Sequence, residues 1–267
     1  MSGKVITITS GKGGVGKTTV SANIASALAM LDKKVVAIDA DIGLRNLDVV
    51  MGLENRIVYD LVDVVEGRCR LRQAMIKDKR QPELYLIPAA QTRDKNAVSP
   101  SDMVLVCDQL REEMDYIIVD SPAGIERGFR NAVAPADQVV IVTNPEVSAV
   151  RDADRIIGLI EAEEKGPGKL LINRLKPQMV ERGEMLSIKD ILDILAIELL
   201  GVIPEDENIL ISTNRGTPLA MSSMNGVSAG QAFRNIAQRL DGLDIPLLDL
   251  TPKSSFMDRL INWLNGN

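Results

Sequence analysis

The sequence predicts an α/β fold, a doubly wound, mostly parallel sheet with helices on both faces. Short apolar runs alternate along the chain with longer stretches whose apolar residues recur at helical spacing, a pattern typical of parallel strands joined by helices. A glycine-rich turn, SGKGGVGKTT, also joins the first run to the first helical stretch. At 267 residues the chain is long enough for one large domain of this class or two small ones.

Seven apolar runs account for the predicted strands. They are rich in valine, isoleucine and leucine, as expected for parallel strands covered on both faces. These runs lie at residues 5–10, 35–39, 84–89, 116–124, 138–145, 169–174 and 199–204. Four stretches between them repeat apolar residues every three or four positions, which predicts amphipathic helices. The predicted helices cover residues 18–31, 102–114, 150–163 and 188–199.

The composition limits the chemistry available to the chain. It has no histidine, so histidine triads, histidine metal sites and imidazole acid–base catalysis are excluded. Cys69 and Cys107 fit no metal-ligand spacing and are expected to be free thiols in a reducing cytosol. The net charge of −6 gives no overall attraction to phosphate backbones and argues against a general nucleic-acid binder. No apolar run reaches the roughly 20 residues of a membrane span, so we expect a cytoplasmic protein with at most a peripheral membrane attachment.

The glycine-rich turn matches the phosphate-binding pattern G-x-x-x-x-G-K-[ST] at Gly11, Gly16, Lys17 and Thr18. Glycines let backbone N–H groups surround a phosphate, and the N-terminus of the next helix adds positive potential. Lys17 is expected to reach the β- and γ-phosphates, and the Thr18 hydroxyl to bind Mg²⁺. The alternative is a strand-to-helix turn that binds no nucleotide. The strand–turn–helix context favours a P-loop that binds a nucleoside triphosphate.

Three aspartates lie at the ends of predicted strands, Asp39 and Asp41 after one and Asp120 after another. In an open α/β sheet these ends meet at the crevice beside the phosphate loop. Carboxylates there can hold Mg²⁺-bound water or orient an attacking water, although a single aspartate after a strand is often only a turn cap. The segment after Asp120 resembles a switch loop in which the Gly124 N–H donates to a γ-phosphate.

Lys12 is a second lysine in the same loop, and it is not needed to bind phosphate within one subunit. One interpretation is a solvated lysine on a mobile loop. The other places Lys12 across a dimer interface, on the partner's nucleotide, where it would offset developing charge as an arginine finger does.

The end of the chain predicts a separate element. The stretch DGLDIPLLDLTPKSS, residues 241–255, contains two prolines and a serine pair, and we expect a flexible linker at 242–253 after a P-loop domain at 1–241. Residues 254–267 are expected to form an amphipathic helix that lies in a membrane interface or, alternatively, packs on the protein's own core. Its apolar face consists of Phe256, Met257, Leu260, Ile261 and Leu264, with Trp263 at the edge.

The charge of this tail is low for a membrane-binding helix. Lys253 and Arg259 are opposed by Asp258, which leaves about one net positive charge, and each basic residue near an anionic surface contributes only ~1 kcal/mol. Insertion is therefore expected to depend mainly on burial of apolar side chains.

Taken together, these segments resemble the ParA/MinD family of ATPases, whose deviant Walker A loop has the extra lysine of KGGVGKTT. Other stretches are similar to the members of that family that select the bacterial division site. These stretches are DADIGLRNLDVVMGLE, AQTRDK, DSPAGIERG, TNPEVSAVRDADRIIG, RGEMLS and GVIPED. The resemblance extends over nearly the whole chain, from Val5 to the tail.

The resemblance implies an ATPase that hydrolyses ATP with Mg²⁺ in an ATP-sandwich dimer, where Lys12 contacts the partner's nucleotide. It implies that Asp39 acts on the metal through water, that Asp41 positions the attacking water and that Asp120 is the Walker B acid. The nucleotide-binding residues that it implies are Gly11, Lys12, Gly13, Gly14, Val15, Gly16, Lys17, Thr18 and Thr19, with Gly124 at the γ-phosphate and Asn173 and Pro204 near the adenine.

The resemblance also implies a cycle and partners. The ATP-bound homodimer would attach to the anionic cytoplasmic face of the inner membrane through its tails, recruit a MinC-type division inhibitor and leave after hydrolysis. A MinE-type activator is a further candidate partner. The helix with Arg151, Asp152 and Asp154 resembles the partner-binding surface, and a solvated helix face is the equally weighted alternative.

Three other functions fit parts of the sequence. A ParA-like DNA-segregation ATPase would use the same loop but needs a basic patch on the dimer. An ATPase of the nitrogenase-reductase type needs cysteines that bridge a cluster between subunits, and Cys69 and Cys107 do not follow the switch regions as such ligands do. A metabolic kinase or ligase needs an acceptor pocket that nothing in the sequence identifies.

Overall fold

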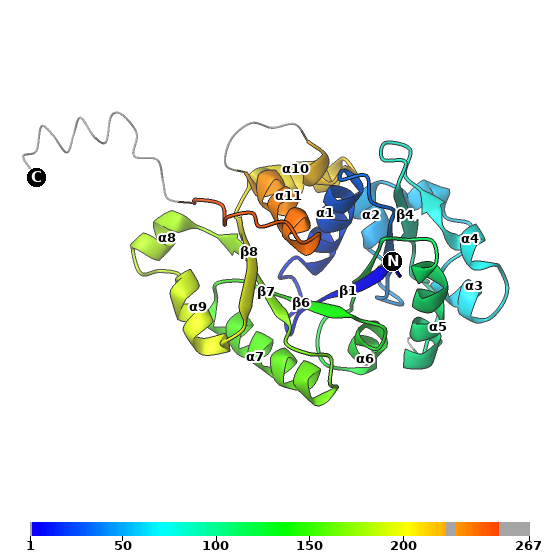
Figure 1. Ribbon diagram of the computed structural model, residues 1–267, viewed down its shortest axis with the longest axis horizontal. Coiled ribbons are helices and arrows are strands. Elements are labelled where there is room, and N and C mark those ends of the chain that lie inside the picture. Colours follow the sequence, from blue (N-terminus) through cyan, green and yellow to red (C-terminus); the bar gives the residue numbers. More distant parts are fainter. Residues whose placement is uncertain (1, 95, 223–227, 251–267) are drawn as a thin grey trace, which may run out of the picture.

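The computed structural model describes residues 2–94, 96–222 and 228–250, and within them an eight-stranded sheet has the order β3-β4-β2-β5-β1-β6-β7-β8 (Figure 1). Its strands are β1 (Lys4–Thr9), β2 (Val35–Asp39), β3 (Ile76–Lys77), β4 (Leu84–Ile87), β5 (Tyr116–Asp120), β6 (Gln138–Thr143), β7 (Lys169–Leu175) and β8 (Glu198–Pro204). All neighbouring strands are parallel except β3 and β4. The predicted doubly wound, mostly parallel sheet is confirmed.

The helices alternate with these strands along the chain. They are α1 (Lys17–Ala29), α2 (Leu47–Met51), α3 (Leu61–Val65), α4 (Leu71–Ala74), α5 (Pro100–Arg111), α6 (Arg127–Val133), α7 (Val147–Ala162), α8 (Pro177–Glu181), α9 (Ile188–Leu195), α10 (Glu207–Asn214) and α11 (Ala229–Leu240), with 3₁₀ turns η1 (Glu54–Arg56) and η2 (Leu219–Met221). No helix among these described residues is long and apolar enough to cross a membrane.

The helices cover both faces of the sheet (Figure 1). Helices α1, α2 and α11 pack with η2 on one face, and α3, α5, α6, α7 and α9 pack on the other. Alternation along each strand divides its side chains between the two layers, so that Val5 faces one and Ile6 the other. This is the arrangement that near-continuous apolar strands predict, because both of their faces are buried.

Several boundaries differ from the predicted ones. The helix predicted to continue to residue 199 ends at Leu195, because Ala196 adopts a left-handed conformation with φ of 49° and β8 begins at Glu198. The predicted strands 84–89, 116–124 and 138–145 end earlier, at Ile87, Asp120 and Thr143. Their apolar or small C-terminal residues continue as loops along the edge of the sheet that holds the site.

Strand register brings the predicted acidic residues together. Asp120 at the end of β5 lies opposite Ile8 of β1 on one side and opposite Asp39 of β2 on the other. The loop after β1 leads directly into α1 at Lys17. The carboxyl ends of three neighbouring strands and the N-terminus of α1 therefore meet at one edge of the sheet, where ligands bind in open α/β folds.

Candidate nucleotide site

The phosphate loop is shaped by glycines that no other residue could replace without strain. Gly14 and Gly16 have φ angles of 78° and 99°, in the region that side chains with a Cβ rarely adopt. A Cβ on Gly11 would lie 2.3 Å from the Asp152 carbonyl oxygen of α7, and one on Gly16 would lie 2.5 Å from the Asn173 amide nitrogen. The loop is thus packed between α7 and β7 and opens at the N-terminus of α1.

Lys17 is buried in this loop, with 8% of its surface exposed. Burial lowers the pKa of its ammonium group, and the charges of Asp120 and Asp41 act in the opposite direction. An ammonium that is largely desolvated and faces two carboxylates can bind a polyphosphate with little further loss of hydration. Lys17 therefore lies near both acidic residues, and its contact with the β- and γ-phosphates stays a prediction.

Asp120 is a buried carboxylate that accepts hydrogen bonds from two residues of α1. The Ser21 hydroxyl donates to Oδ1 over 2.8 Å, and the Thr18 hydroxyl also donates to this carboxyl group. Burial raises the pKa of Asp120, although these hydrogen bonds and Lys17 oppose the rise. Ser21 is a partner of Asp120 that sequence reasoning missed; its position one helical turn after Lys17 is the signal that could have found it.

Asp39 is buried beside Asp120 but points toward α2. Its Oδ1 accepts the Asp41 N–H over 3.0 Å, and its Oδ2 accepts the N–H groups of Asn46 and Leu47, each over 3.1 Å. Burial and the nearby charge of Asp120 raise the pKa of Asp39. Asp39 is therefore a cap for the turn that leads into α2, the structural role that a single aspartate after a strand often has, and its action on a metal through water stays a prediction.

The donor set suits Mg²⁺ bound mainly by phosphate and water. A hydroxyl and two carboxylates supply the hard oxygen ligands that Mg²⁺ prefers. Among the described residues no group of three or more acidic, cysteine or histidine side chains could hold a metal ion alone. A cation held by Thr18, with Asp39 and Asp120 nearby, stays a prediction.

The two loops next to the site differ in how they are held. Asp41 is half-buried and lines a cavity of about 380 Å³ together with Pro122 and Ala123. Gly124, with φ of 91°, donates its N–H to the Ser10 carbonyl over 3.2 Å. Its predicted donation to a γ-phosphate therefore requires the loop after β5 to move away from Ser10.

Lys12 is not a freely solvated side chain. Its Nζ lies 3.1 Å from the Glu146 carboxylate and 3.1 Å from the Ser148 hydroxyl, at the N-terminal end of α7. The Lys12 side chain remains 42% exposed. Within one chain the Lys12 side chain thus extends from the loop to the N-terminal end of α7, and a contact with nucleotide across a dimer stays a prediction.

A second cavity, of about 660 Å³, lies where adenine is expected. Asn173 lies at its inner end, 4% exposed, and donates its amide N–H to the Val15 carbonyl over 2.8 Å. Pro204 ends β8 but does not line the cavity; the next two residues, Glu205 and Asp206, do. The predicted residues Gly16 and Thr19 also line it, whereas sequence reasoning missed Arg174, Glu207, Ile209, Leu210, Ile211 and Thr213. The sequence feature that could have identified α10 as a wall of this cavity is Asp206, which caps the helix by accepting the Asn208 N–H.

The predicted partner surface lies directly behind the phosphate loop. Arg151 and Asp154 of α7 are exposed, and Asp152 is half-buried, 3.6 Å from Arg155. The Asp152 backbone packs closely against Gly11, so this part of α7 and the phosphate loop are in contact. The membrane face (Phe256, Met257, Leu260, Ile261, Trp263 and Leu264) lies outside the described residues.

The sequence matches the family described as the CobQ/CobB/MinD/ParA nucleotide binding domain over residues 6–219. It is 55% identical over 98% of its length to the septum site-determining protein MinD of Synechocystis, of which it covers 99%. The chain belongs to the MinD branch of this nucleotide-binding family. The MinD of Bacillus subtilis is 54% identical over 96% of the chain and 95% of that protein.

Solved MinD structures have the same fold. The MinC:MinD cell division protein complex of Aquifex aeolicus matches with a TM-score of 0.85 and 52% identity over 92% of this chain and 98% of that one. MinD of Pyrococcus horikoshii complexed with Mg-ADP matches with a TM-score of 0.79 and 30% identity over 89% and 96%. The fold described above is thus shared with MinD proteins from distant organisms.

Proposed function

We propose that this chain is a Mg²⁺-dependent ATPase whose ATP-bound dimer selects the division site from the membrane surface. The observation that carries the proposal is the meeting of the buried Lys17 and Asp120 with the half-buried Thr18, in a chain that resembles septum site-determining proteins over nearly its whole length.

In this proposal each group of the site has one task in hydrolysis. Lys17 offsets the charge of the β- and γ-phosphates, and Asp120 orients the Thr18 hydroxyl through their hydrogen bond. Mg²⁺, when bound, would neutralise charge on the phosphate oxygens. Asp41 orients the attacking water from the rim of the crevice. The Gly124 N–H donates to the γ-phosphate after leaving Ser10.

Dimerisation would supply the last group. Lys12 leaves Glu146 and contacts the nucleotide of the second subunit, where it offsets the charge that develops in the transition state. Its exchange of partners is easy because an exposed ion pair of this kind contributes only about 0–1 kcal/mol. Hydrolysis is thereby restricted to the dimer.

The proposed output of dimerisation is membrane attachment. A single short amphipathic segment binds a bilayer weakly and reversibly, while two on one dimer can raise avidity by ~10²–10⁴. ATP-driven pairing therefore brings the tails to the membrane, and hydrolysis releases them. Support for a MinC-type partner is the Aquifex MinC:MinD complex, with Arg151 and Asp154 of α7 as the candidate contact; a MinE-type activator is a further candidate.

Co-sedimentation with anionic vesicles tests this function. The full chain is compared with a chain that ends at Pro252, each in ATP and in ADP. Pelleting of the full chain only, and only with ATP, is the expected result. Pelleting that is independent of nucleotide would mean that one tail suffices and that dimerisation is not the switch. If nothing pellets, the tail is not a membrane anchor.

The rival DNA-segregation function has less support. The match to a putative plasmid partition protein of Borrelia burgdorferi, at 22% identity, shows the fold alone. Retention on DNA that requires ATP and is lost as salt rises would favour this function instead. The nitrogenase-reductase type of ATPase is disfavoured because Cys107 is completely buried in α5 and both cysteines are free.

A further inference from the structure

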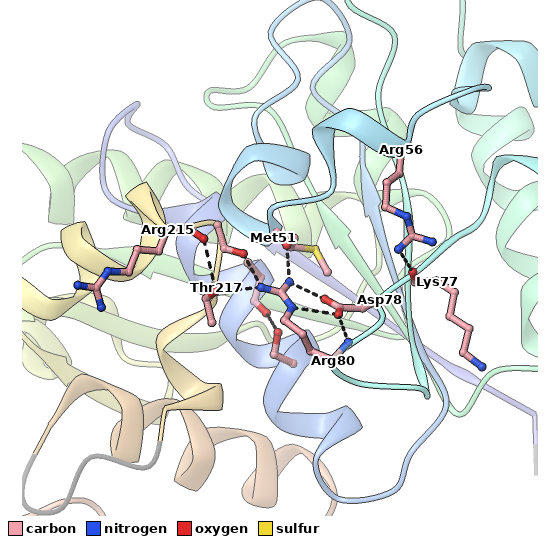
Figure 2. A network of polar contacts seen from close by, with 10 residues as sticks. Met51, Arg56, Lys77, Asp78, Arg80, Arg215 and Thr217 are labelled. Carbon is pink, nitrogen blue, oxygen red and sulfur yellow. Dashed lines mark hydrogen bonds and ion pairs between the residues drawn. The ribbon is translucent and has the colours of Figure 1, made fainter.

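Arg80 connects three segments that are distant in sequence (Figure 2). Its guanidinium donates to the Met51 carbonyl at the end of α2 over 2.5 Å and to the Gly216 carbonyl after α10 over 2.6 Å. It also donates to the Thr217 hydroxyl over 2.9 Å and to the Asp78 carboxylate over 2.7 Å. We call Arg80 with these four partners the Arg80 clamp.

The Arg80 clamp is built to be rigid. Asp78 is 1% exposed, and although burial would raise its pKa, the hydrogen bonds and charge of Arg80 hold that pKa below its usual value. The carboxylate therefore stays ionised and fixes the guanidinium plane, which is the geometry in which arginine forms its most directional hydrogen bonds. The remaining N–H groups then reach the Met51 and Gly216 carbonyls.

The two backbones that the clamp joins are also in direct contact. Gly52 and Gly216 have φ angles of 64° and 60°. A Cβ on Gly52 would lie 2.5 Å from the Gly216 carbonyl oxygen, and one on Gly216 would lie 2.5 Å from the Gly52 Cα. Helix α2 therefore cannot shift at its C-terminal end without moving the segment that follows α10.

Both helices also reach the nucleotide site. The first N–H groups of α2, at Asn46 and Leu47, bond Asp39. Helix α10 lines the 660 Å³ cavity that is the candidate base site, together with Gly16 and Asn173. The Arg80 clamp thus connects the helix that lines the base site with the helix whose first N–H groups bond Asp39.

We propose that Arg80 is a positioning residue that couples the base site to Asp39. In this proposal, binding of a base in the α10 cavity is transmitted through the Arg80 clamp to α2 and thus to Asp39. The inference rests on the proposed function, because it takes the cavity as the nucleoside site. It assigns to Arg80 no contact with nucleotide. Loss of Arg80 should uncouple α2 from the base while leaving phosphate binding intact.

Amide hydrogen exchange of the full chain tests the coupling directly, with ADP and inorganic pyrophosphate as paired probes. The difference between the two isolates the effect of the base. We expect ADP to slow exchange more than pyrophosphate does in residues 207–214 and also in residues 46–52, by a coupling on the order of fivefold. In Arg80→Gln the base effect should persist in 207–214 and disappear in 46–52.

Arg56 is the matched control. It lies in η1 and donates to the carbonyl of Lys77 in β3, one residue before Asp78 (Figure 2). It bonds neither α2 nor the segment after α10. Arg56→Gln should therefore keep the wild-type pattern. Thr217→Val removes one acceptor and leaves the Asp78 pair intact, so it serves if Arg80→Gln does not fold; it should weaken the base effect in 46–52 partially.

The possible outcomes distinguish failure of the coupling from failure of the proposed function. A wild-type chain that binds neither probe overturns the proposed function and the coupling with it. Wild-type chain that binds ADP without a base effect in 46–52 overturns the coupling alone. The coupling is also overturned if Arg80→Gln unfolds more easily but keeps the base effect in residues 46–52, because Arg80 then has only a structural role.

Discussion

At the scale of single residues, the site contains a pair of buried carboxylates that are costly to keep ionised. Asp39 and Asp120 are side by side and both 1% exposed, and burial raises the pKa of each. Such arrangements cluster at functional sites because a bound cation or substrate relieves the repulsion. The cost of holding this pair ionised is a stability cost of the nucleotide-free chain.

Removal of one of these charges should stabilise the nucleotide-free chain. Because the pKa of Asp120 is raised on folding, the folded chain binds a proton more readily than the unfolded chain, and the free energy of unfolding falls as pH rises above about 4. Asp120→Asn should therefore raise that free energy by about 1–2 kcal/mol near pH 8 and by less near pH 5, where Asp120 takes up a proton.

Urea unfolding at the two pH values measures this effect. The exposed Asp154→Asn is the control and should change little. The same Asp120→Asn variant should lose ATP hydrolysis. An equal gain at both pH values would contradict the raised pKa of Asp120.

Substitution of Lys12 separates its two possible roles. Its pair with Glu146 is exposed, so Lys12→Gln should change the free energy of unfolding by less than about 1 kcal/mol. A lysine that acts as an arginine finger does should, when lost, lower the turnover of the dimer by on the order of 10³-fold. Glu146→Gln breaks the same ion pair and should keep turnover. Equal losses in both variants, in a steady-state ATPase assay, would assign the effect to the pair within one chain.

At the scale of elements, helices α1 and α2 position the chemistry through contacts that neither makes alone. Helix α1 is buried on nearly all sides between the sheet, α11 and η2. Its Asn23 accepts the Ala220 N–H of η2 over 2.8 Å. Its many alanines and serines permit this close packing, since a larger residue would overfill the space.

The close contact between α2 and the segment after α10 should make Gly52 harder to replace than a glycine of similar φ in open space. Gly52→Ala meets both a positive φ and the Gly216 carbonyl, whereas Gly67→Ala meets a positive φ of 71° with open space around the Cβ. The left-handed conformation costs roughly 1–2 kcal/mol in each, and the overlap at Gly52 should add about 1–3 kcal/mol. Urea unfolding of the two variants measures the difference, and equal losses would show that the close contact relaxes freely.

At the scale of the whole molecule, the P-loop domain and the tail are joined by the residues after α11. The amphipathic face predicted for residues 254–267 has only about one net positive charge to attract anionic lipid. Leu260→Asp should therefore abolish ATP-dependent pelleting with vesicles, because it places a charge on the apolar face, while Arg259→Gln on the polar face should reduce it only slightly.

The salt dependence of pelleting provides a second check on the tail. Between about 0.05 M and 0.3 M NaCl the electrostatic part of binding is increasingly screened. Retention of most pelleting at the higher concentration is expected for binding by apolar burial. A collapse of binding there, or a large effect of Arg259→Gln, would instead show that charge drives attachment.

The sequence alone determined the parts of this protein that depend on local order. The loop from Gly11 to Thr19 is recognisable because its glycines, Lys17 and Thr18 act through neighbouring backbone. The strands are recognisable because burial on both faces requires continuous apolar runs. The tail's amphipathic pattern is likewise local, and its action on a membrane stays a prediction.

Only the tertiary structure decided which distant residues meet. Nothing in the order of residues shows that Asp39 caps α2, that Lys12 lies on Glu146, or that Arg80 joins α2 to the segment after α10. These contacts depend on the register of neighbouring strands and on the packing of helices that the chain places far apart. Local patterns specify an element's identity, whereas contacts between elements are set by the shape and charge that each presents to the others.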